Sequence, residues 1–243
     1  MGAPSGYRER LELMDAARLE RTLQRIASEI VERHPGLGDL VLVGVRTRGV
    51  PLARRLAAQI RETSGQLVPV GALDITLYRD DLTTIAAHPV LKGTDIPVSI
   101  DGRSVVLVDD VLFTGRTVRA ALDELIDFGR PARIELAVVV DRDHRELPIR
   151  ADYVGQSLST GRQEIVHVSL REEDGDDRVV LMEKQPEPAP PAPRPAPVAA
   201  AKARASSAAA KPPAKGSRPR PAKAGGRGRK PPARRGPAAR GRR

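Results

Sequence analysis

The 243-residue chain has a net charge of +10, but this average conceals an acidic body and a basic tail. Residues 184–243 hold 17 Lys and Arg and only one acid, Glu187, so their net charge is +16 and that of residues 1–183 is −6. The absence of cysteine excludes disulfides, thiolate catalysis and cysteine metal sites, and without an apolar signal-peptide core or an apolar run of about 18 residues we expect a cytoplasmic protein.

Within the body, helix-like and strand-like segments alternate. Apolar residues recur at helical spacing over residues 15–33, where Asp15 is the expected N-cap, and again over 50–63 and 117–128. Apolar runs typical of buried strands, and shorter strand-like pieces, lie at residues 40–45, 67–77, 104–108, 134–140, 153–154, 165–168 and 179–181. This order predicts an α/β fold with a central, mainly parallel sheet flanked by helices, which binds ligands beyond the carboxyl ends of its strands.

The segment between Tyr78 and Ile100 has no clear period and begins with the charged run Arg79-Asp80-Asp81. Long loops within compact domains are often lids over functional sites. A charged loop of this kind can equally be a solvated surface segment, so the pattern alone leaves both interpretations open.

Two carboxylates and a phosphate-binding turn follow the strand at 104–108. Asp109 and Asp110 can accept hydrogen bonds from a vicinal diol, or hold Mg²⁺ through its waters. Beyond them, backbone N–H groups, two hydroxyls and a helix N-terminus suit a phosphate, and the residues concerned are Val111, Leu112, Phe113, Thr114, Gly115, Arg116 and Thr117. Each half alone is common as helix capping or as a simple turn, but the joined pattern indicates a ribose 5-phosphate site.

A second loop with anion-binding character follows the strand at 40–45. It consists of Arg46, Thr47, Arg48 and Gly49. Two guanidinium groups and a glycine at a strand end suit a polyanion such as pyrophosphate. Taken alone, such arginines are also common as surface charges.

Four sequence blocks resemble the type I phosphoribosyltransferases, and within them the bifunctional pyrimidine operon attenuator/uracil phosphoribosyltransferase family. The blocks are residues 43–49, 74–81, 105–117 and 140–155. The third is similar to the phosphoribosyl-pyrophosphate signature of that class. The resemblance covers residues 11–183 and does not extend to the tail.

The resemblance implies a type I phosphoribosyltransferase fold with a flexible hood loop, and a reaction of uracil with phosphoribosyl pyrophosphate that gives UMP and diphosphate. It implies Mg²⁺ as cofactor, held indirectly by Asp109 and Asp110, and it places the leaving pyrophosphate on the loop at 46–49. A closed hood would exclude the water that hydrolyses an activated ribose. The expected catalytic residues are Arg48, Arg79, Asp109 and Asp110.

Recognition of uracil is implied for the loop after the strand at 134–140. The resemblance points to Asp141 and Arg142, with backbone groups near Val154 and Gly155, although charged residues at a strand end are often only solubilising. Purine-specific relatives have a carboxylate just before the Thr-Gly pair, where this chain has Phe113, which argues against a purine substrate. No side-chain base for N1 of uracil is evident.

Members of the resembled family also bind a stem-loop of the pyrimidine operon mRNA and control its transcription or translation. The residues expected to contact RNA phosphates are Arg25, Arg33, His144, Arg145 and Arg150. The acidic body and four departures from the family pattern argue against retained RNA binding, namely Gln24, Ser28, Asp143 and Gln156. His144 is equally interpreted as a partly buried loop histidine bonded to backbone.

The sequence therefore predicts a uracil phosphoribosyltransferase that also regulates the pyrimidine operon through uridine-nucleotide-dependent mRNA binding. The alternative is an RNA-binding regulator that uses the site only as a nucleotide sensor. The resemblance implies a homo-oligomer. We predict one domain at residues 1–183 and a disordered Pro-, Ala-, Lys- and Arg-rich tail at 184–243, which either binds nucleic acid non-specifically or is a solvated extension.

Overall fold

The computed structural model describes residues 6–78 and 93–185. Arg79 and Asp80 of the expected hood, and the tail beyond Gln185, lie outside the described residues. Within the described ranges, no helix is long and apolar enough to cross a membrane.

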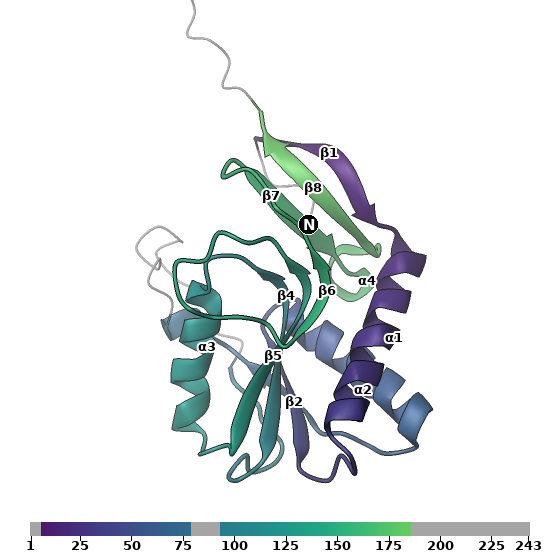
Figure 1. The fold of residues 1–243 in the computed structure, drawn as a ribbon. Helices are drawn as coiled ribbons and strands as arrows, with labels where there is room; N and C mark the ends of the chain where they lie inside the picture. Colours follow the sequence, from purple (N-terminus) through teal and green to yellow (C-terminus); the bar gives the residue numbers. More distant parts are fainter. Residues whose placement is uncertain (1–5, 79–92, 186–243) are drawn as a thin grey trace, which may run out of the picture. The chain divides into compact units, whose positions relative to one another are not determined.

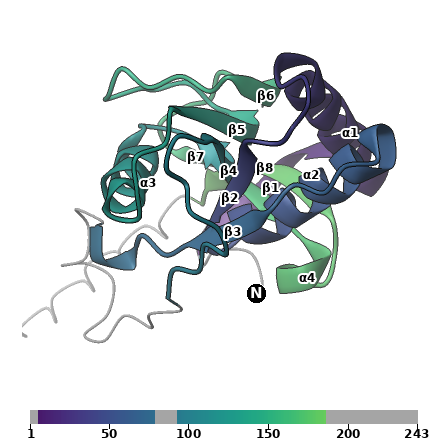
Figure 2. The ribbon, with the colours of Figure 1, turned by 90° about the horizontal axis from the view of Figure 1, so that it is seen from below.

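Five parallel strands form the central sheet, in the order β3-β2-β4-β5-β6 (Figure 1). They are β2 (Leu40–Val45), β3 (Val70–Leu73), β4 (Ser104–Leu112), β5 (Arg133–Asp141) and β6 (Tyr153–Ser157). The helices that pack on them are α1 (Ala16–Arg33), α2 (Gly49–Ser64) and α3 (Arg116–Asp127). Figure 2 shows α3 on one side of the strands and α1 and α2 on the other. The predicted parallel sheet flanked by helices is confirmed.

The middle strands of this sheet are buried on both faces. On β4, Val106 and Val108 join the cluster that contains the apolar faces of α1 and α2. Val105 and Leu107 join the cluster that contains the apolar face of α3. Because successive strand residues point to opposite faces, a strand covered on both sides requires a continuous apolar run.

The first helix begins where the sequence predicts. Oδ1 of Asp15 accepts a hydrogen bond from the backbone N–H of Arg18 at 2.7 Å, which caps the first turn of α1. The buried stripe of the helix consists of Leu19, Leu23, Ile26, Ala27 and Ile30. α1 ends at His34, whose backbone N–H still bonds to the carbonyl of Ile30.

A second, antiparallel sheet contains three strands in the order β1-β8-β7. The strands are β1 (Tyr7–Met14), β7 (Glu164–Ser169) and β8 (Arg178–Lys184), and the short helix α4 (Arg171–Asp174) joins β7 to β8. This small sheet lies beyond the carboxyl ends of the parallel strands (Figure 1). Leu13, Val168 and Leu181 belong to the same buried cluster as the apolar faces of α1 and α2, so the two sheets share one core.

Several elements differ from the sequence-based expectation. β1 was not predicted, because most of its side chains are exposed and only Leu13 and Met14 are buried. The strand expected at 67–77 is wrong in extent, since β3 covers only Val70–Leu73 and a 3-10 turn follows. Asp74 causes this turn by accepting hydrogen bonds from the backbone N–H of Thr76 at 3.1 Å and from its hydroxyl. β8 runs through Lys184, one residue past the predicted domain boundary.

Candidate active site

The polar loops predicted to bind substrate lie at one edge of the parallel sheet. The loop 46–49 follows β2, the 109–117 segment ends β4 and opens α3, and Asp141 ends β5. Because β2, β4 and β5 are parallel neighbours, their carboxyl ends meet at this edge. The structure thus brings these three segments together, as the sequence predicted.

The loop 46–49 packs directly on the backbone of β4. A Cβ built on Gly49 would overlap the carbonyl oxygen of Val108, so only glycine allows this approach. The backbone N–H of Arg46 bonds to the carbonyl of Leu73 at 2.9 Å, and its Nε bonds to the carbonyl of Gly93 at 3.0 Å. The peptide bond between Arg46 and Thr47 is cis. This loop is therefore held between β3 and β4, with Thr47 exposed.

Asp109 and Asp110 are among the last residues of strand β4, since the strand continues to Leu112 rather than ending at Val108. Oδ1 of Asp109 accepts from the backbone N–H of Asp110 at 2.9 Å, and Oδ1 of Asp110 accepts from the N–H of Val111 at 2.8 Å. Burial raises the pKa of Asp110, and the positive charge of Arg48 opposes this shift. These backbone hydrogen bonds orient both carboxylates, and a carboxylate oxygen can accept more than one hydrogen bond, which suits the pair to a diol.

The turn before α3 has the backbone of an anion site. Gly115 precedes the helix with φ of +92°, a left-handed conformation that favours glycine. The N-cap residue Gly115 has no side chain to cap the helix, and the backbone N–H of Arg116 donates to the Thr114 hydroxyl at 3.4 Å. This turn, at the positive end of the helix, suits a phosphate. The carbonyl of Thr114 accepts from the N–H groups of Glu146 and Leu147, which ties this turn to the loop after β5.

Arg142 is buried among protein acceptors. Its side chain is 4% exposed, and burial lowers its pKa. Nε donates to the Thr160 hydroxyl at 3.2 Å, and Nη2 donates to the carbonyl of Glu164 at 2.5 Å. The guanidinium carbon lies 3.9 Å from the centroid of the Phe113 ring. Arg142 thus anchors the segment before β7 against Phe113, and its part in uracil binding stays a prediction.

The loop after Asp141 is held by its own polar groups. Asp143 and His144 have φ of +65° and +64°, which are uncommon for residues with a Cβ. Asp141 accepts from the backbone N–H of Asp143 at 3.0 Å and pairs with Arg145 at 2.5 Å. Nη1 of Arg145 also donates to the carbonyl of Phe113 at 2.6 Å. Asp143 therefore holds a left-handed conformation that glycine adopts without steric cost.

The residues expected to contact RNA fall into two groups. On α1, Nη2 of Arg25 donates to the carbonyl of Gly155 at 2.7 Å, and the Arg33 guanidinium lies 4.7 Å from the Tyr153 ring centroid. His144 bonds to the carbonyl of Thr160 at 2.5 Å and Arg145 to that of Phe113, so both lie in the site loop. The structure agrees with the interpretation of His144 as a loop histidine bonded to backbone. Arg150 is exposed.

Sequence reasoning missed the acidic residues that contact α2. Asp174 pairs with Arg48, and Glu172 and Asp177 pair with Arg55. In the sequence, the acidic run between β7 and β8 is typical of a solvent-exposed turn. The available signal was the spacing of the two arginines, since residues seven apart lie on the same face of a helix.

The site also has groups that could bind a metal ion together with a polyphosphate substrate. No group of three or more His, Asp or Glu side chains in residues 6–78 and 93–185 could cage a metal ion. Mg²⁺ is commonly held by one or two carboxylates together with substrate phosphates and waters. Asp109 and Asp110 provide two adjacent carboxylates of this kind.

A family model and solved structures identify the broad class of protein to which the chain belongs. The model of the phosphoribosyl transferase domain family matches residues 10–173. A hypoxanthine-guanine phosphoribosyltransferase from Bacillus anthracis is 20% identical with a TM-score of 0.55, over 71% of this chain and 98% of that one. A hypoxanthine phosphoribosyl transferase from Trypanosoma cruzi is 20% identical with a TM-score of 0.57, over 72% of this chain and 92% of that one. The fold is that of the type I phosphoribosyltransferases.

Relatives with higher sequence identity to this chain define its family more narrowly. The bifunctional protein PyrR of Pelotomaculum thermopropionicum is 60% identical over 176 residues, which are 72% of this chain and 97% of that protein. The bifunctional protein PyrR of Thermus aquaticus is 60% identical over 178 residues, 73% of this chain and 98% of that protein. The chain belongs to the phosphoribosyltransferase family and, within it, to the bifunctional PyrR proteins.

Proposed function

We propose that the chain transfers the phosphoribosyl group of phosphoribosyl pyrophosphate to uracil, which gives UMP and diphosphate. N1 of uracil forms a bond to C1 of the ribose, and the bond between C1 and pyrophosphate breaks with its electron pair on the leaving group. The N1 proton passes to solvent. The observation that carries the proposal is the meeting of three polar loops, at 46–49, 109–117 and 141–142, at one edge of the parallel sheet.

The ribose 5-phosphate is assigned to the segment from Asp109 to Thr117. The N–H groups of the first turn of α3 receive the phosphate, and the carboxylates of Asp109 and Asp110 receive the ribose hydroxyls. Burial of Asp109, which is 8% exposed, keeps its carboxylate in one orientation. Most of the rate enhancement then comes from positioning, because the reacting atoms are held in line before bond breaking.

The pyrophosphate is assigned to Arg46, Thr47, Arg48 and Gly49. Charge accumulates on this leaving group as the C1 bond breaks, so fixed guanidinium and N–H donors stabilise the transition state more than the ground state. Mg²⁺, when bound, adds neutralisation of the same charge. Asp109 and Asp110 are the residues assigned to hold it through waters. Arg79, the fourth expected catalytic residue, belongs to the hood outside the described residues.

Uracil is assigned to the loop after β5, beside Phe113. Asp141 and the backbone near Val154 and Gly155 supply polar partners for the base, while Arg142 orders the wall of the pocket through its contact with Phe113. Phe113 offers no carboxylate to a purine, which supports a pyrimidine base. The base reacts as its N1 anion, because no side chain among the described loop residues is placed as an obvious general base.

A second candidate function is regulation of the pyrimidine operon by uridine-nucleotide-dependent binding to an mRNA stem-loop, as a homo-oligomer. The relatives carry the word bifunctional in their names. Arg33 and Arg150 are exposed cations that phosphates can reach. Arg25, His144 and Arg145 hold contacts within the protein that RNA would have to share. The tail at 184–243 would add non-specific affinity that falls steeply with salt.

A uracil assay tests the enzyme proposal. The full chain and a chain ending after Gln185, which keeps all of β8, are incubated with uracil, phosphoribosyl pyrophosphate and Mg²⁺ while UMP and diphosphate are measured. We expect equal turnover in both, and a loss of at least about 100-fold in the double variant Asp109→Asn/Asp110→Asn with an unchanged circular dichroism spectrum. Folded wild-type protein without turnover would instead favour a nucleotide-sensing regulator.

A further inference from the structure

Arg48 of the pyrophosphate loop is held by a carboxylate from outside the loop. Its Nε donates to Oδ2 of Asp174 at 3.1 Å, and its Nη2 donates to Oδ1 at 2.9 Å. This two-bond arrangement fixes both the position and the plane of the guanidinium group. Asp174 ends α4, between β7 and β8, so the contact joins the small sheet to the loop at the carboxyl end of β2.

Asp174 is itself fixed. Its side chain is 3% exposed, and Oδ2 accepts from the backbone N–H of Leu170 at 3.1 Å. Burial opposes ionisation of Asp174, but the hydrogen bonds from Arg48 and from Leu170 N–H outweigh it and lower the pKa. The carboxylate is therefore charged at neutral pH and rigid, which suits it to orient a partner.

The positive charge of Arg48 acts on two carboxylates, those of Asp174 and Asp110. Its charge counteracts the burial of Asp110, the residue assigned to the ribose, so the guanidinium acts on that carboxylate as well as on Asp174. Among the described residues, Nη1 of Arg48 makes no hydrogen bond, and the side chain is 25% exposed. One end of the guanidinium is thus occupied by Asp174, and the other end is open to a ligand.

We propose that Asp174 is a positioning residue, which holds Arg48 so that Nη1 can donate to the pyrophosphate of the substrate. This rests on the pyrophosphate role proposed for the 46–49 loop. Without Asp174, the flexible arginine would be free to turn onto Asp110, whose carboxylate its charge already influences. That contact would remove a donor from pyrophosphate and an acceptor from the ribose at the same time.

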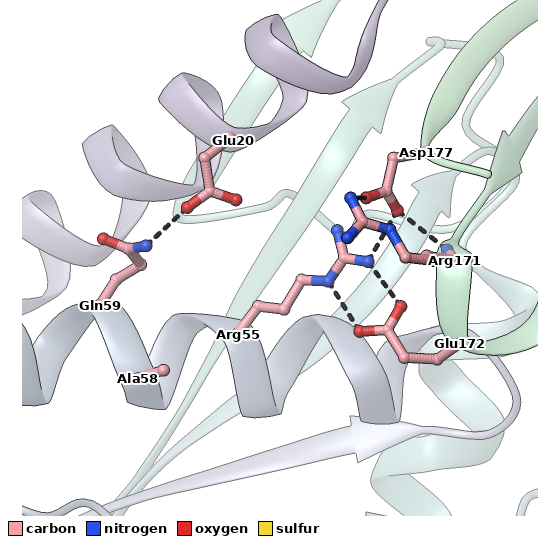
Figure 3. Close-up of a pocket in the computed structure, with 7 residues that line it drawn as sticks. All are labelled: Glu20, Arg55, Ala58, Gln59, Arg171, Glu172 and Asp177. Atoms are coloured by element: carbon pink, nitrogen blue, oxygen red, sulfur yellow. Dashed lines mark hydrogen bonds and ion pairs between the residues drawn. The ribbon is translucent and has the colours of Figure 1, made fainter. Parts of the chain in front are cut away.

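A second contact between α2 and the same segment provides a matched control. Figure 3 shows Arg55 of α2 reaching Glu172 and Asp177, with distances of 2.5 and 2.6 Å from its Nη2. These residues line a cavity of about 360 Å³, in which Arg171 also pairs with Asp177 and the amide of Gln59 donates to Glu20. Among the described residues, the hydrogen bonds and ion pairs of Arg55 go to Glu172 and Asp177, so Arg55 anchors the segment without bonding to the pyrophosphate loop.

The test uses Asp174→Asn in the full chain, with Glu172→Gln as the matched control. Affinity for phosphoribosyl pyrophosphate and for inorganic pyrophosphate, each with Mg²⁺, is measured by calorimetry, and KM values are measured in the uracil assay. We expect Asp174→Asn to weaken both affinities about tenfold and to leave the KM for uracil unchanged. Glu172→Gln should leave all of these values within about twofold of wild type.

A purely structural role predicts a different pattern. If Glu172→Gln weakens pyrophosphate binding as much as Asp174→Asn does, or if Asp174→Asn leaves it unchanged, the proposal is wrong. In an Arg48→Ala background, Asp174→Asn should cause no further loss, because its effect acts through Arg48. A further tenfold loss in that background would also contradict the proposal.

Binding and turnover separate this inference from the proposed function. Wild-type protein that binds phosphoribosyl pyrophosphate but does not transfer it to uracil would refute the enzyme proposal, while the variants still test Asp174 by binding alone. Wild-type protein that binds neither phosphoribosyl pyrophosphate nor pyrophosphate would overturn both.

Discussion

The parallel sheet and the small antiparallel sheet bury their side chains in different ways. In β4 and β5 the residues from Val105 to Val108 and from Leu136 to Val140 are all buried, because helices cover both faces. In β1 only Leu13 and Met14 are buried, and β7 is buried only at Val168 and Ser169. The first sheet is a closed interior layer, whereas the second is covered mainly where it meets α1 and α2.

The two sheets therefore contribute differently to the site. Parallel strands end at a common edge, so their loops place the phosphate, ribose and pyrophosphate groups of a ligand side by side. The small sheet contributes acidic residues near α4 that hold α2 and Arg48 from the other side. The rigid layer therefore carries the binding loops, and the partly exposed layer fixes their orientation.

Among the predicted substitutions, Gly49→Ala should reduce turnover and stability most, because there is no space for a side chain where the loop 46–49 packs on β4. A Cβ would overlap the carbonyl oxygen of Val108, so the pyrophosphate loop must move. We expect turnover to fall about 100-fold and the free energy of unfolding to fall by about 3 kcal/mol. The uracil assay and urea denaturation measure the two effects.

Gly38→Ala is the control for this prediction. Gly38 is exposed, and the nearest atom to an added Cβ is a carbonyl oxygen at 3.8 Å. Turnover should be that of wild type, and stability should change by less than about 0.5 kcal/mol. Normal activity in Gly49→Ala would show that the contact between loop and strand is dispensable.

Leu181→Ala tests whether the small sheet unfolds with the rest of the domain. Leu181 of β8 is 6% exposed and belongs to the cluster that also contains Leu19 and Leu23 of α1. Its truncation should cost about 2 kcal/mol and shift a single unfolding transition to lower urea. Leu67→Ala, at a position 75% exposed, should cost much less. A separate early transition in Leu181→Ala would mean that the two sheets unfold independently.

Substitution of Glu135, a buried acidic residue on β5, should have a smaller effect on the free energy of unfolding. Burial opposes its ionised form, but hydrogen bonds with His34 at 2.7 Å and from Tyr153 at 2.8 Å outweigh that cost and lower its pKa below 4.5. Stability from this group is therefore present above about pH 4.5 and is lost as the pH falls through the lowered value. Glu135→Gln should cost about 1 kcal/mol at pH 7 and weaken the loss of stability in acid.

The counterpart of Glu135 in the small sheet is Glu183, which pairs with Arg8 at 2.6 Å. Side chains in this pair are 31% and 63% exposed, so water screens the interaction. Glu183→Gln should change stability by less than about 0.5 kcal/mol at any pH from 4 to 8. Thermal unfolding across that range compares the two variants, and equal effects would mean that burial does not distinguish the two sheets.

Several features of the site were predictable because they depend on local sequence. The run from Asp109 to Thr117 and the loop at 46–49 each follow a continuous apolar strand, and the carboxyl ends of parallel strands share one edge. Phosphate-binding turns need glycine and N–H groups in adjacent residues, so Gly115 and its neighbours carry that signal. The contacts of Arg142 were not predictable, because Thr160 and Glu164 come from a segment with no distinguishing pattern.

By itself, the sequence determined the parallel sheet, its three main helices and the loops that bind substrate, since each follows from periodicity or from residues adjacent in the chain. Only the tertiary structure decided which charges meet. Arg48 and Asp174 are 126 residues apart in sequence, and nothing local in either marks the other as its partner. The tertiary fold brings α4 next to Arg48 and to Arg55 of α2, and the burial of Asp174 then makes the pairing with Arg48 strong enough to orient the loop.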